Sequence, residues 1–238
     1  MSFPSQGARA NKLLALLPSS DYCAIAREIT YVELPRGVML AKTGRPIEYV
    51  YFLTNGIGSV IVATAEGNRA EAGIFGFDGY IPTSAIAGME TSPYDVLIQV
   101  AAKGYEMPYE NFRRWMDSNR NFSRIMIRSI EAFSIQLAYT AVSNAIHEVT
   151  QRLARWLLMC DDRIMGNEIE LTHEFLSIML AVRRPTVTTS LHVLEGQGLI
   201  RSERGNIIIR NRSGLEQYAH DAYGRPETEY FRLMQGFS

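Results

Sequence analysis

Arginine and threonine side chains gather between residues 172 and 204 of this 238-residue sequence. A guanidinium group can donate two parallel hydrogen bonds to guanine or to a phosphate, and a threonine offers a hydroxyl for phosphate and a methyl group for thymine. A polar side chain at a helix start can add a phosphate contact. The chemistry indicated is recognition of bases and phosphates. The set comprises Thr172, His173, Arg183, Arg184, Pro185, Thr186, Thr188, Thr189 and Arg204.

Two short helices joined by a tight connection must position these side chains. The first begins after Thr172, whose hydroxyl can accept a hydrogen bond from an otherwise unpaired backbone N–H, and its apolar pattern breaks at residues 180–183. The second has Pro185 in its first turn, where a missing N–H costs nothing. Its apolar residues recur at i, i+4 and i+7, so the arginines and threonines occupy the opposite face. These apolar residues are Val187, Leu191 and Leu194.

A small hairpin follows the second helix. Gly196 and Gly198 end that helix, a turn is expected at residues 204–206, and the β-branched residues 207–209 form a strand. Two helices and a hairpin in this order are typical of a winged helix-turn-helix, whose second helix enters the major groove of DNA. The other interpretation is a helical subdomain whose charged face is only solvated.

The distribution of charge favours one basic face over a generally basic protein. The chain has a net charge of −1 and an isoelectric point of about 6.4. Between Arg183 and Arg212, however, six arginines oppose two glutamates, a local surplus that suits nucleic acid. Arginine supplies 21 of the 24 basic residues. Its forked donor suits phosphate and guanine, although a GC-rich genome would produce the same preference.

The residues before this region show a different pattern of residue types. Between residues 30 and 108, six short β-like runs alternate with glycine turns, a spacing that predicts a β-sandwich or barrel. Together with the helices, this predicts an α+β chain in three parts. They are a sensor-like β-domain with flanking helices at 1–120, a long helix and hinge at 121–147, and the winged helix-turn-helix at 148–238.

A long helix without internal proline or glycine is predicted over residues 121–149. One apolar seam steps by three and four residues, as in a coiled coil, and a second apolar set runs beside it. We expect one set to pack on the β-domain and the other on a second copy, which makes the protein a homodimer. The alternative is one helix buried in a monomer. The seam assigned to the dimer comprises Met126, Ile130, Phe133, Leu137, Ala141 and Asn144, and the second set comprises Ile127, Ser134, Ala138, Val142 and Ala145.

Catalytic and metal-binding motifs are not expected. His147 and His173 are each followed by glutamate, but neither has a second histidine at the spacing of a zinc protease. Cys23 and Cys160 are far apart, which predicts free thiols, and no cofactor is indicated. No stretch has the length of a membrane span or the pattern of a signal peptide. We expect a non-enzymatic cytoplasmic protein without a bound metal.

Two stretches carry a resemblance to the CRP/FNR family, the cyclic-AMP receptor protein and its relatives. They are residues 34–62, LPRGVMLAKTGRPIEYVYFLTNGIGSVIV, and residues 171–200, LTHEFLSIMLAVRRPTVTTSLHVLEGQGLI, with an Arg-x-Thr-Val run at 184–187. The resemblance implies an N-terminal double-stranded β-helix (a β-roll like that of cyclic-nucleotide-binding domains), a long dimerisation helix and a C-terminal winged helix-turn-helix. It also implies a bacterial transcription regulator that binds palindromic DNA as a homodimer and contacts RNA polymerase.

The resemblance assigns the base-reading positions only in part. Arg184 falls on the arginine with which the family reads a base. Pro185 stands where the cyclic-AMP receptor has a base-contacting glutamate, and Thr189 stands where it has a second arginine. The preferred DNA site is therefore expected to differ from that of the cyclic-AMP receptor.

The sensor departs further from the family pattern. The family's cyclic-nucleotide cassette has a Gly-Glu-x-Gly turn and an Arg-Ser pair. Here the turn at residues 76–79 reads Gly-Phe-Asp-Gly, and no arginine lies within residues 70–112. A buried cyclic phosphate would lack a partner for its charge, so we predict that cyclic AMP is not the effector. The cassette positions, which are the candidates for contact with an unknown small-molecule effector, are Phe77, Asp78, Gly79, Ser92 and Pro93.

A second hypothesis for the whole chain is a sensor or scaffold that does not bind DNA. It would bind a small molecule or a protein through the β-roll, and its helix-turn-helix would have no affinity that depends on salt.

Overall fold

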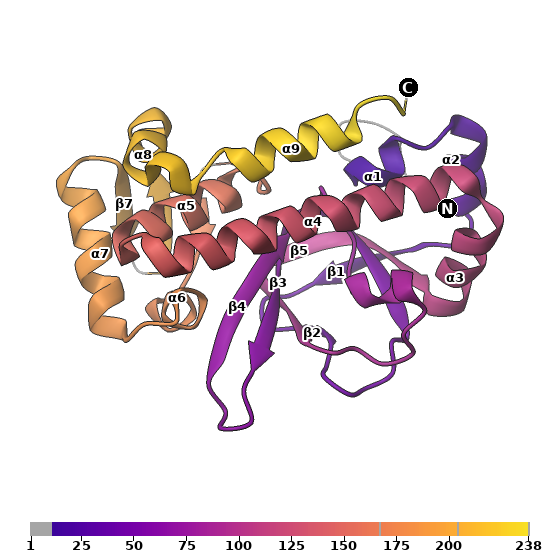
Figure 1. The fold of residues 1–238 in the computed structure, drawn as a ribbon, viewed down its shortest axis with the longest axis horizontal. Helices are drawn as coiled ribbons and strands as arrows, with labels where there is room; N and C mark the ends of the chain where they lie inside the picture. The colour runs from indigo at the N-terminus through magenta and orange to yellow at the C-terminus, as the bar shows by residue number, and fades with distance from the viewer. Residues whose placement is uncertain (1–10, 167, 204, 238) are drawn as a thin grey trace.

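Five antiparallel strands form the N-terminal part of the computed structural model, which describes residues 11–166, 168–203 and 205–237. Their order in the sheet is β1-β5-β3-β4, and β2 also pairs with β5. The sheet lies along one side of the long helix α4 (Arg120–Ile146) in Figure 1. The predicted β-roll is confirmed. The strands are β1 (Thr30–Leu34), β2 (Met39–Ala41), β3 (Tyr49–Ala63), β4 (Arg69–Phe75) and β5 (Asp95–Pro108).

Strand β3 joins two runs that the sequence separates by a glycine. Its register against β5 shifts between Leu53 and Gly58, which is the mark of bulges that bend a strand. Gly56 has a φ of 85°, and a Cβ there would lie 2.5 Å from Cα of Ala102. Only glycine tolerates that combination. The glycine therefore allows β3 to bend and continue, where the sequence predicts a turn between two strands.

Apolar side chains fill the inside of the roll. The ring of Phe75 is almost fully buried and belongs to the same cluster as Val60, Ile81 and Ile98. It lies against Gly58, where a Cβ would stand 2.1 Å from Cζ of Phe75. The end of β4 therefore places an aromatic ring, held close by a glycine, inside the roll.

Short helices cover the end of the roll on the right of Figure 1. Asn11 caps the first of them, because its Oδ1 accepts a hydrogen bond from the Leu13 N–H at 3.0 Å. The Asn11 amide also donates to the carbonyls of Leu53 at 3.0 Å and Gly79 at 2.8 Å. One buried side chain thus ties the first helix to β3 and to the turn after β4. The helices are α1 (Lys12–Ala15), α2 (Ser19–Ile25), the 3-10 helix η1 (Thr83–Ala87) and α3 (Tyr109–Ser118).

Helix α4 buries one side within its own chain and exposes the opposite side. The buried residues are Phe122, Ile125, Met126, Ser129, Ala132, Gln136 and Ser143. The seam assigned to the dimer is corrected at Met126, which does not face a partner. Met126 is buried and packs in a cluster with Phe112 and Phe122. Of the other seam residues, Ile130, Phe133 and Leu137 are half-buried, and Ala141 and Asn144 are exposed. The side open to a partner carries the second set of residues, from Ile127 to Ala145.

The winged part follows a break in the helix. Helix α4 ends at Ile146 and α5 begins at Val149, at the hinge that the sequence predicts. The core of this part includes Ile57 and Ile74 of the roll, so the two parts share one hydrophobic cluster. Its elements are α5 (Val149–Asp161), β6 (Glu168–Glu170), α6 (His173–Leu180), α7 (Arg184–Gly196), β7 (Ile200–Glu203), β8 (Asn206–Ile209), α8 (Arg212–Ala219) and the 3-10 helix η2 (His220–Ala222).

The C-terminal end of the chain returns to the roll. Helix α9 (Arg225–Met234) packs along α4. Arg128 of α4 donates to the carbonyls of Leu233 at 2.9 Å and Gln235 at 3.0 Å. Among the described residues, none of the helices combines the length and apolar character that a bilayer span requires.

Candidate nucleic-acid interface

Residues at the two ends of α6, the first helix of the pair, determine where it begins and stops. Thr172 caps its start, because the hydroxyl accepts a hydrogen bond from the Phe175 N–H at 3.3 Å. Ala181 ends it in the left-handed conformation, with φ 50° and ψ 45°. An alanine adopts this conformation at a cost of roughly 1–2 kcal/mol. The turn therefore holds strained backbone, and it aims the following helix outward.

The second helix, α7, presents the predicted DNA-binding face to solvent. Pro185 lies in its first turn, and Val187, Leu191 and Leu194 are buried, as the spacing predicts. The polar residues on the opposite face lie at the start of α7 and at its N-terminal cap, Arg183. Of these, Arg183, Arg184, Pro185, Thr186 and Thr189 are exposed, and Thr188 is half-buried. A helix buried on one side and polar on the other can enter the major groove without unfolding any part of the chain.

Hydrogen bonds connect the starts of α6 and α7. The Thr188 hydroxyl lies 3.1 Å from Nδ1 of His173, and Arg184 forms an ion pair with Glu174 at 3.0 Å. Both members of that pair are about two-thirds exposed, so the pair contributes little stability. Arg184 can therefore exchange Glu174 for a phosphate or a base at small cost.

Two threonines of α7 hydrogen-bond the preceding turn of the helix. The Thr189 hydroxyl donates to the Pro185 carbonyl at 3.1 Å, and the Thr188 hydroxyl donates to the Arg184 carbonyl at 3.2 Å. These bonds satisfy the hydroxyls within the helix. Thr189 is exposed, and a threonine methyl group can make an apolar contact with a thymine methyl group.

The hairpin after α7 forms the wing. Strand β8 pairs with β7 on one side and with β6 on the other, so the wing is the edge of a three-stranded sheet. Arg204, at its predicted tip, lies outside the described residues. Its neighbour Gly205 has a φ of 88°, which fits the turn predicted at residues 204–206.

The local positive charge is smaller than the sequence count indicates. Arg212 is surrounded by acceptors: it pairs with Asp161, with Asp162 at 2.6 Å and with Glu216 at 2.9 Å. Arg201 pairs with Glu203. These contacts neutralise two of the six arginines, and Arg184 is paired only through exposed groups. Among the described residues, the arginines of this stretch outside these two sets of contacts are Arg183 and Arg184 at the start of α7 and Arg210 after β8.

The turn at residues 76–79 of the sensor is joined by an ion pair to Arg163 of the winged part. Asp78 accepts hydrogen bonds from the Gly76 N–H at 3.0 Å and from Nε of Arg163 at 3.2 Å, and its second oxygen lies 2.7 Å from Nη2 of Arg163. Both side chains of this ion pair are largely buried. The sequence gives no sign of this pair, because 85 residues separate its members. The one guanidinium at the turn is therefore already committed to a carboxylate.

The five candidate effector residues do not form one site. Phe77, Asp78 and Gly79 line a cavity beside α4. Ser92 is buried away from that cavity, where its hydroxyl donates to the Tyr94 carbonyl at 2.6 Å, and Pro93 is exposed. This corrects the grouping of the five, because the loop that carries Ser92 and Pro93 pairs with residues 43–47.

A buried carboxylate joins the roll to the winged part. Glu71 of β4 accepts hydrogen bonds from Ser59 at 2.5 Å and Gln99 at 3.0 Å within the roll, and from Nε1 of Trp156 on α5 at 2.8 Å. Burial raises the pKa of Glu71 to about 7, against the three hydrogen bonds and the nearby Arg155 guanidinium, all of which lower it. No motif in the sequence singles out this residue. Its only local signal is a glutamate at an inward-facing position of an alternating strand.

Comparison with known proteins agrees with this architecture. A family model, the Crp-like helix-turn-helix domain, matches residues 151–218. No curated protein in the comparison matches the sequence. The solved structures include a CRP/FNR-family regulator from Eubacterium rectale, with 16% identity, a TM-score of 0.66 and coverage of 87% of this chain and 97% of that one.

Two further structures match over similar lengths. FixK2 from Bradyrhizobium japonicum has 16% identity and a TM-score of 0.65, and the match covers 81% of this chain and 98% of FixK2. The c-di-GMP responsive global regulator CLP from Xanthomonas campestris has 15% identity and a TM-score of 0.64, with coverage of 81% and 99%. At these identities the likeness establishes the fold, and the family model establishes the type of the helix-turn-helix. The protein therefore has a Crp-like helix-turn-helix domain at residues 151–218, and along most of its length it has the fold of the CRP/FNR-family regulators that it matches.

Proposed function

We propose that this protein is a DNA-binding transcription regulator that acts as a homodimer on a palindromic site without cyclic AMP. The exposed face of α7 carries the proposal: its arginines and threonines project from a helix whose other face is buried. The division into a sensor (1–120), a long helix (121–147) and a winged part (148–238) belongs to the same proposal, as do contacts with RNA polymerase. The proteins that match are transcription regulators, a class that generally performs no catalysis.

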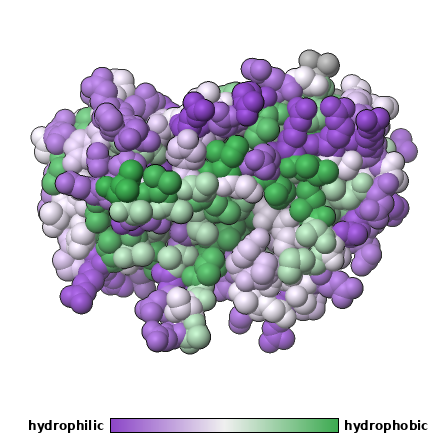
Figure 2. All heavy atoms as spheres, in the orientation of Figure 1, coloured by the Kyte–Doolittle hydropathy of each residue, from purple (hydrophilic) through white to green (hydrophobic). Residues whose placement is uncertain are grey.

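The exposed side of α4 supports the homodimer. Ile127 is 56% exposed and Val142 is 50% exposed, with Ser134, Ala138 and Ala145 on the same side. Figure 2 shows apolar atoms along the course of α4 on the face turned toward the viewer. Small and β-branched residues at three- and four-residue steps suit close packing of two helices. A second copy of α4 on this side would bring two α7 helices into one molecule, which matches a two-fold symmetric DNA site.

Selection of binding sites from random DNA by the purified full-length protein tests the proposal. We expect a palindromic site whose half-sites lie one helical turn apart, about 34 Å, and an affinity that falls steeply as salt rises because phosphate contacts release counterions. Recovery of no sequence, together with affinity independent of salt, would instead support the sensor or scaffold without DNA binding.

Arg184→Ala is expected to weaken binding to the selected site by roughly 1–3 kcal/mol and to relax the preference at one base pair of each half-site. The reason is that Arg184 is exposed at the start of α7 and its only ion pair, among the described residues, is with exposed Glu174. Titration with the selected site and with single-base variants measures both effects. Arg232→Ala on α9, an exposed arginine remote from α7, is the matched control. Full affinity and unchanged selectivity in Arg184→Ala would remove this residue from the reading face.

Millimolar cyclic AMP is expected to leave the melting temperature unchanged. A ligand that binds only the native state raises stability by RT ln(1 + [L]/Kd), and the guanidinium at the turn is not free to meet the cyclic phosphate. Arg163 is committed to Asp78, and the Phe75 ring fills the inside of the roll. A scan with and without the nucleotide measures this, with a cyclic-AMP-binding protein treated in parallel. Saturable binding at micromolar concentration would contradict the expectation.

A further inference from the structure

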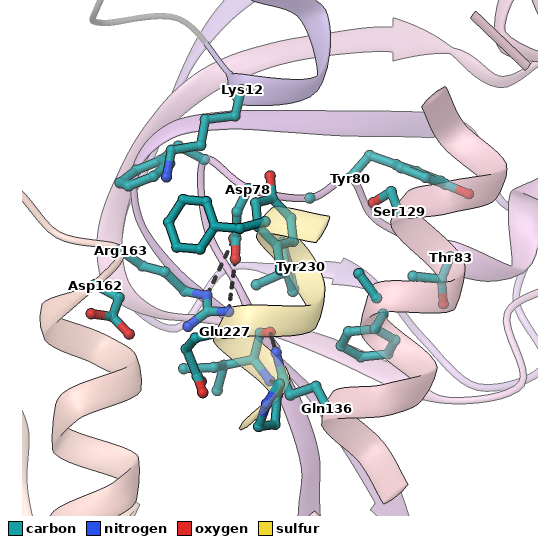
Figure 3. Close-up of a pocket in the computed structure, with 18 of the residues that line it drawn as sticks. Lys12, Asp78, Tyr80, Thr83, Ser129, Gln136, Asp162, Arg163, Glu227 and Tyr230 are labelled. Atoms are coloured by element: carbon teal, nitrogen blue, oxygen red, sulfur yellow. Dashed lines mark hydrogen bonds and ion pairs between the residues drawn. The ribbon is translucent and has the colours of Figure 1, made fainter. Parts of the chain in front are cut away.

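A cavity of about 270 Å³ lies where the roll, α4, the winged part and α9 meet. Figure 3 shows that its walls come from segments far apart in the sequence, with Asp78 from the turn after β4, Gln136 from α4 and Tyr230 from α9. The volume is close to the lower limit of about 300 Å³ for small-molecule pockets. Ser92 and Pro93, the Arg-Ser positions of the nucleotide cassette, are not among the lining residues. The cavity thus shares the turn at residues 76–79 with the cassette, and its remaining walls come from α4, the winged part and α9.

Aromatic side chains form a large part of the wall of this cavity, beside polar and charged ones. Phe75, Phe77, Phe133, Tyr230 and Phe231 all line it, and Ala132 provides a small patch on α4 between them. Aromatic rings bury a flat apolar partner well, through offset or edge-to-face contacts. The shape and the lining therefore favour a ligand with one or two aromatic rings.

Two of the three cationic side chains that line the cavity are paired with carboxylates, and a third carboxylate, Glu227, accepts a hydrogen bond from the Gly224 N–H at 3.0 Å. Arg163 pairs with Asp78, and Arg212 pairs with Asp162. Lys12 differs: its ammonium group lies 4.5 Å from the ring centre of Phe77 and 6.0 Å from those of Tyr230 and Phe231, and among the described residues it has no ion pair. A cation held over aromatic faces keeps its charge available to an anion. Lys12 therefore supplies a positive group at the rim of an aromatic cavity.

Two buried hydroxyls of the lining residues, those of Tyr80 and Tyr230, have no hydrogen-bond partner among the described residues. The Tyr230 hydroxyl makes no hydrogen bond within the described part of the chain, although it lies in the cavity wall beside Asp78 and Arg163 in Figure 3. Burial raises the pKa of Tyr230, so the hydroxyl stays protonated and can donate. A buried donor that is left unpaired destabilises the fold. Among the described residues, this hydroxyl has no acceptor, so an oxygen of a ligand can fill that place.

We propose that this cavity binds a small aromatic acid. The ring system lies between the aromatic side chains, an oxygen of the ligand accepts the hydrogen bond from Tyr230, and the carboxylate faces Lys12. The occupant touches the roll, α4 and the winged part together, since Arg163, Arg212 and Tyr223 line the same cavity. Binding at this site does not depend on the proposed function in DNA binding.

Calorimetric titration of the full-length protein with benzoate, 4-hydroxybenzoate and indole-3-acetate tests the proposal. We expect saturable binding of at least one acid, with one site per chain. We also expect the neutral analogue of that acid, in which an alcohol replaces the carboxylate, to bind about tenfold more weakly, because it loses a charge-assisted contact of roughly 1.4 kcal/mol. Absence of saturable binding by all three acids at millimolar concentration would overturn the proposal. Equal binding of an acid and its neutral analogue would overturn the role of Lys12.

Three variants connect binding to the cavity. Lys12→Met keeps the length of the side chain and should remove the preference for the acid. Tyr230→Phe removes only the unpaired hydroxyl and should weaken binding several-fold, whereas Tyr31→Phe, an exposed tyrosine of β1, should not. Ala132→Phe should fill the cavity and abolish binding in a protein whose circular dichroism is unchanged. Unaltered affinity in both Tyr230→Phe and Lys12→Met would place the ligand elsewhere.

Discussion

A glutamate in place of Ala138 is expected to leave the protein monomeric and to lower its affinity for a palindromic DNA site at least about 100-fold. Ala138 lies on the exposed side of α4 with Ile127 and Val142. In a dimer this side meets its own copy, so each glutamate would be buried without a partner. Burying an unpaired charge costs several kcal/mol, and each 1.4 kcal/mol is a factor of ten. A monomer also loses the second α7, and with it half of the DNA contacts.

Sedimentation and DNA titration on the same samples measure this effect. Ser118→Glu, which adds the same charge at an exposed position on α3, is the matched control and should remain dimeric with unchanged DNA affinity. A dimer that tolerates glutamate at position 138 would show that copies associate through another surface. A wild-type monomer that binds palindromic DNA with full affinity would reject the homodimer itself.

The stability of the fold is expected to fall as the pH rises from about 4.5 to about 7, by roughly 3 kcal/mol from Glu71 alone. The pKa of Glu71 is raised from its ordinary value of 4.5 to about 7 in the folded chain. Below pH 4.5 the group is protonated in both states, and above pH 7 it is ionised in both. Between these values the folded state holds a proton that the unfolded state has released. Raising the pH therefore removes stability in this window.

Denaturant unfolding at several pH values measures this dependence. Glu71→Gln cannot titrate and should remove most of the change, whereas Glu66→Gln, an exposed glutamate of the turn between β3 and β4, should retain it. Because Nε1 of Trp156 donates to Glu71, its fluorescence should report the same titration in the folded protein. A wild-type curve that is flat or rises between pH 4.5 and 7, with no difference from Glu71→Gln, would contradict the raised pKa.

The residues around Glu71 can also accommodate the protonated, neutral form of this carboxyl group. Oε1 of Gln99 is buried without a hydrogen-bond partner among the described residues, while its Nε2 donates to Glu71. If Glu71 is protonated, a flipped Gln99 amide can accept the new O–H, since the two ends of an amide exchange places by rotation. A proton on Glu71 can thus give the buried Gln99 oxygen a hydrogen-bond donor in the cluster that joins β4 to α5.

The sequence by itself determined the helix-turn-helix and the long helix. Thr172 as a cap, Pro185 in a first turn and the apolar spacing of α7 act over one to three helical turns, so each can be read from neighbouring residues. The glycines likewise marked the bends and turns of the roll, although at Gly56 the strand continues where a turn was expected. Local chemistry is sufficient wherever a residue's partners lie within a few positions.

Only the tertiary structure decided what joins these parts. Arg163 meets Asp78 across 85 residues, and Trp156 meets Glu71 across the same distance, so no local pattern identifies either pair. Helix α9 has a local signal in Pro226 near its start and in Glu227, which accepts a hydrogen bond from the Gly224 N–H, but the surface on which it packs belongs to α4, far away in the sequence. Packing of the roll decides which face of α4 remains exposed. The sequence does not decide it, because apolar residues recur at helical spacing on both faces. Burial and pairing are properties of the assembled chain, and they placed the cavity at the junction where its four parts meet.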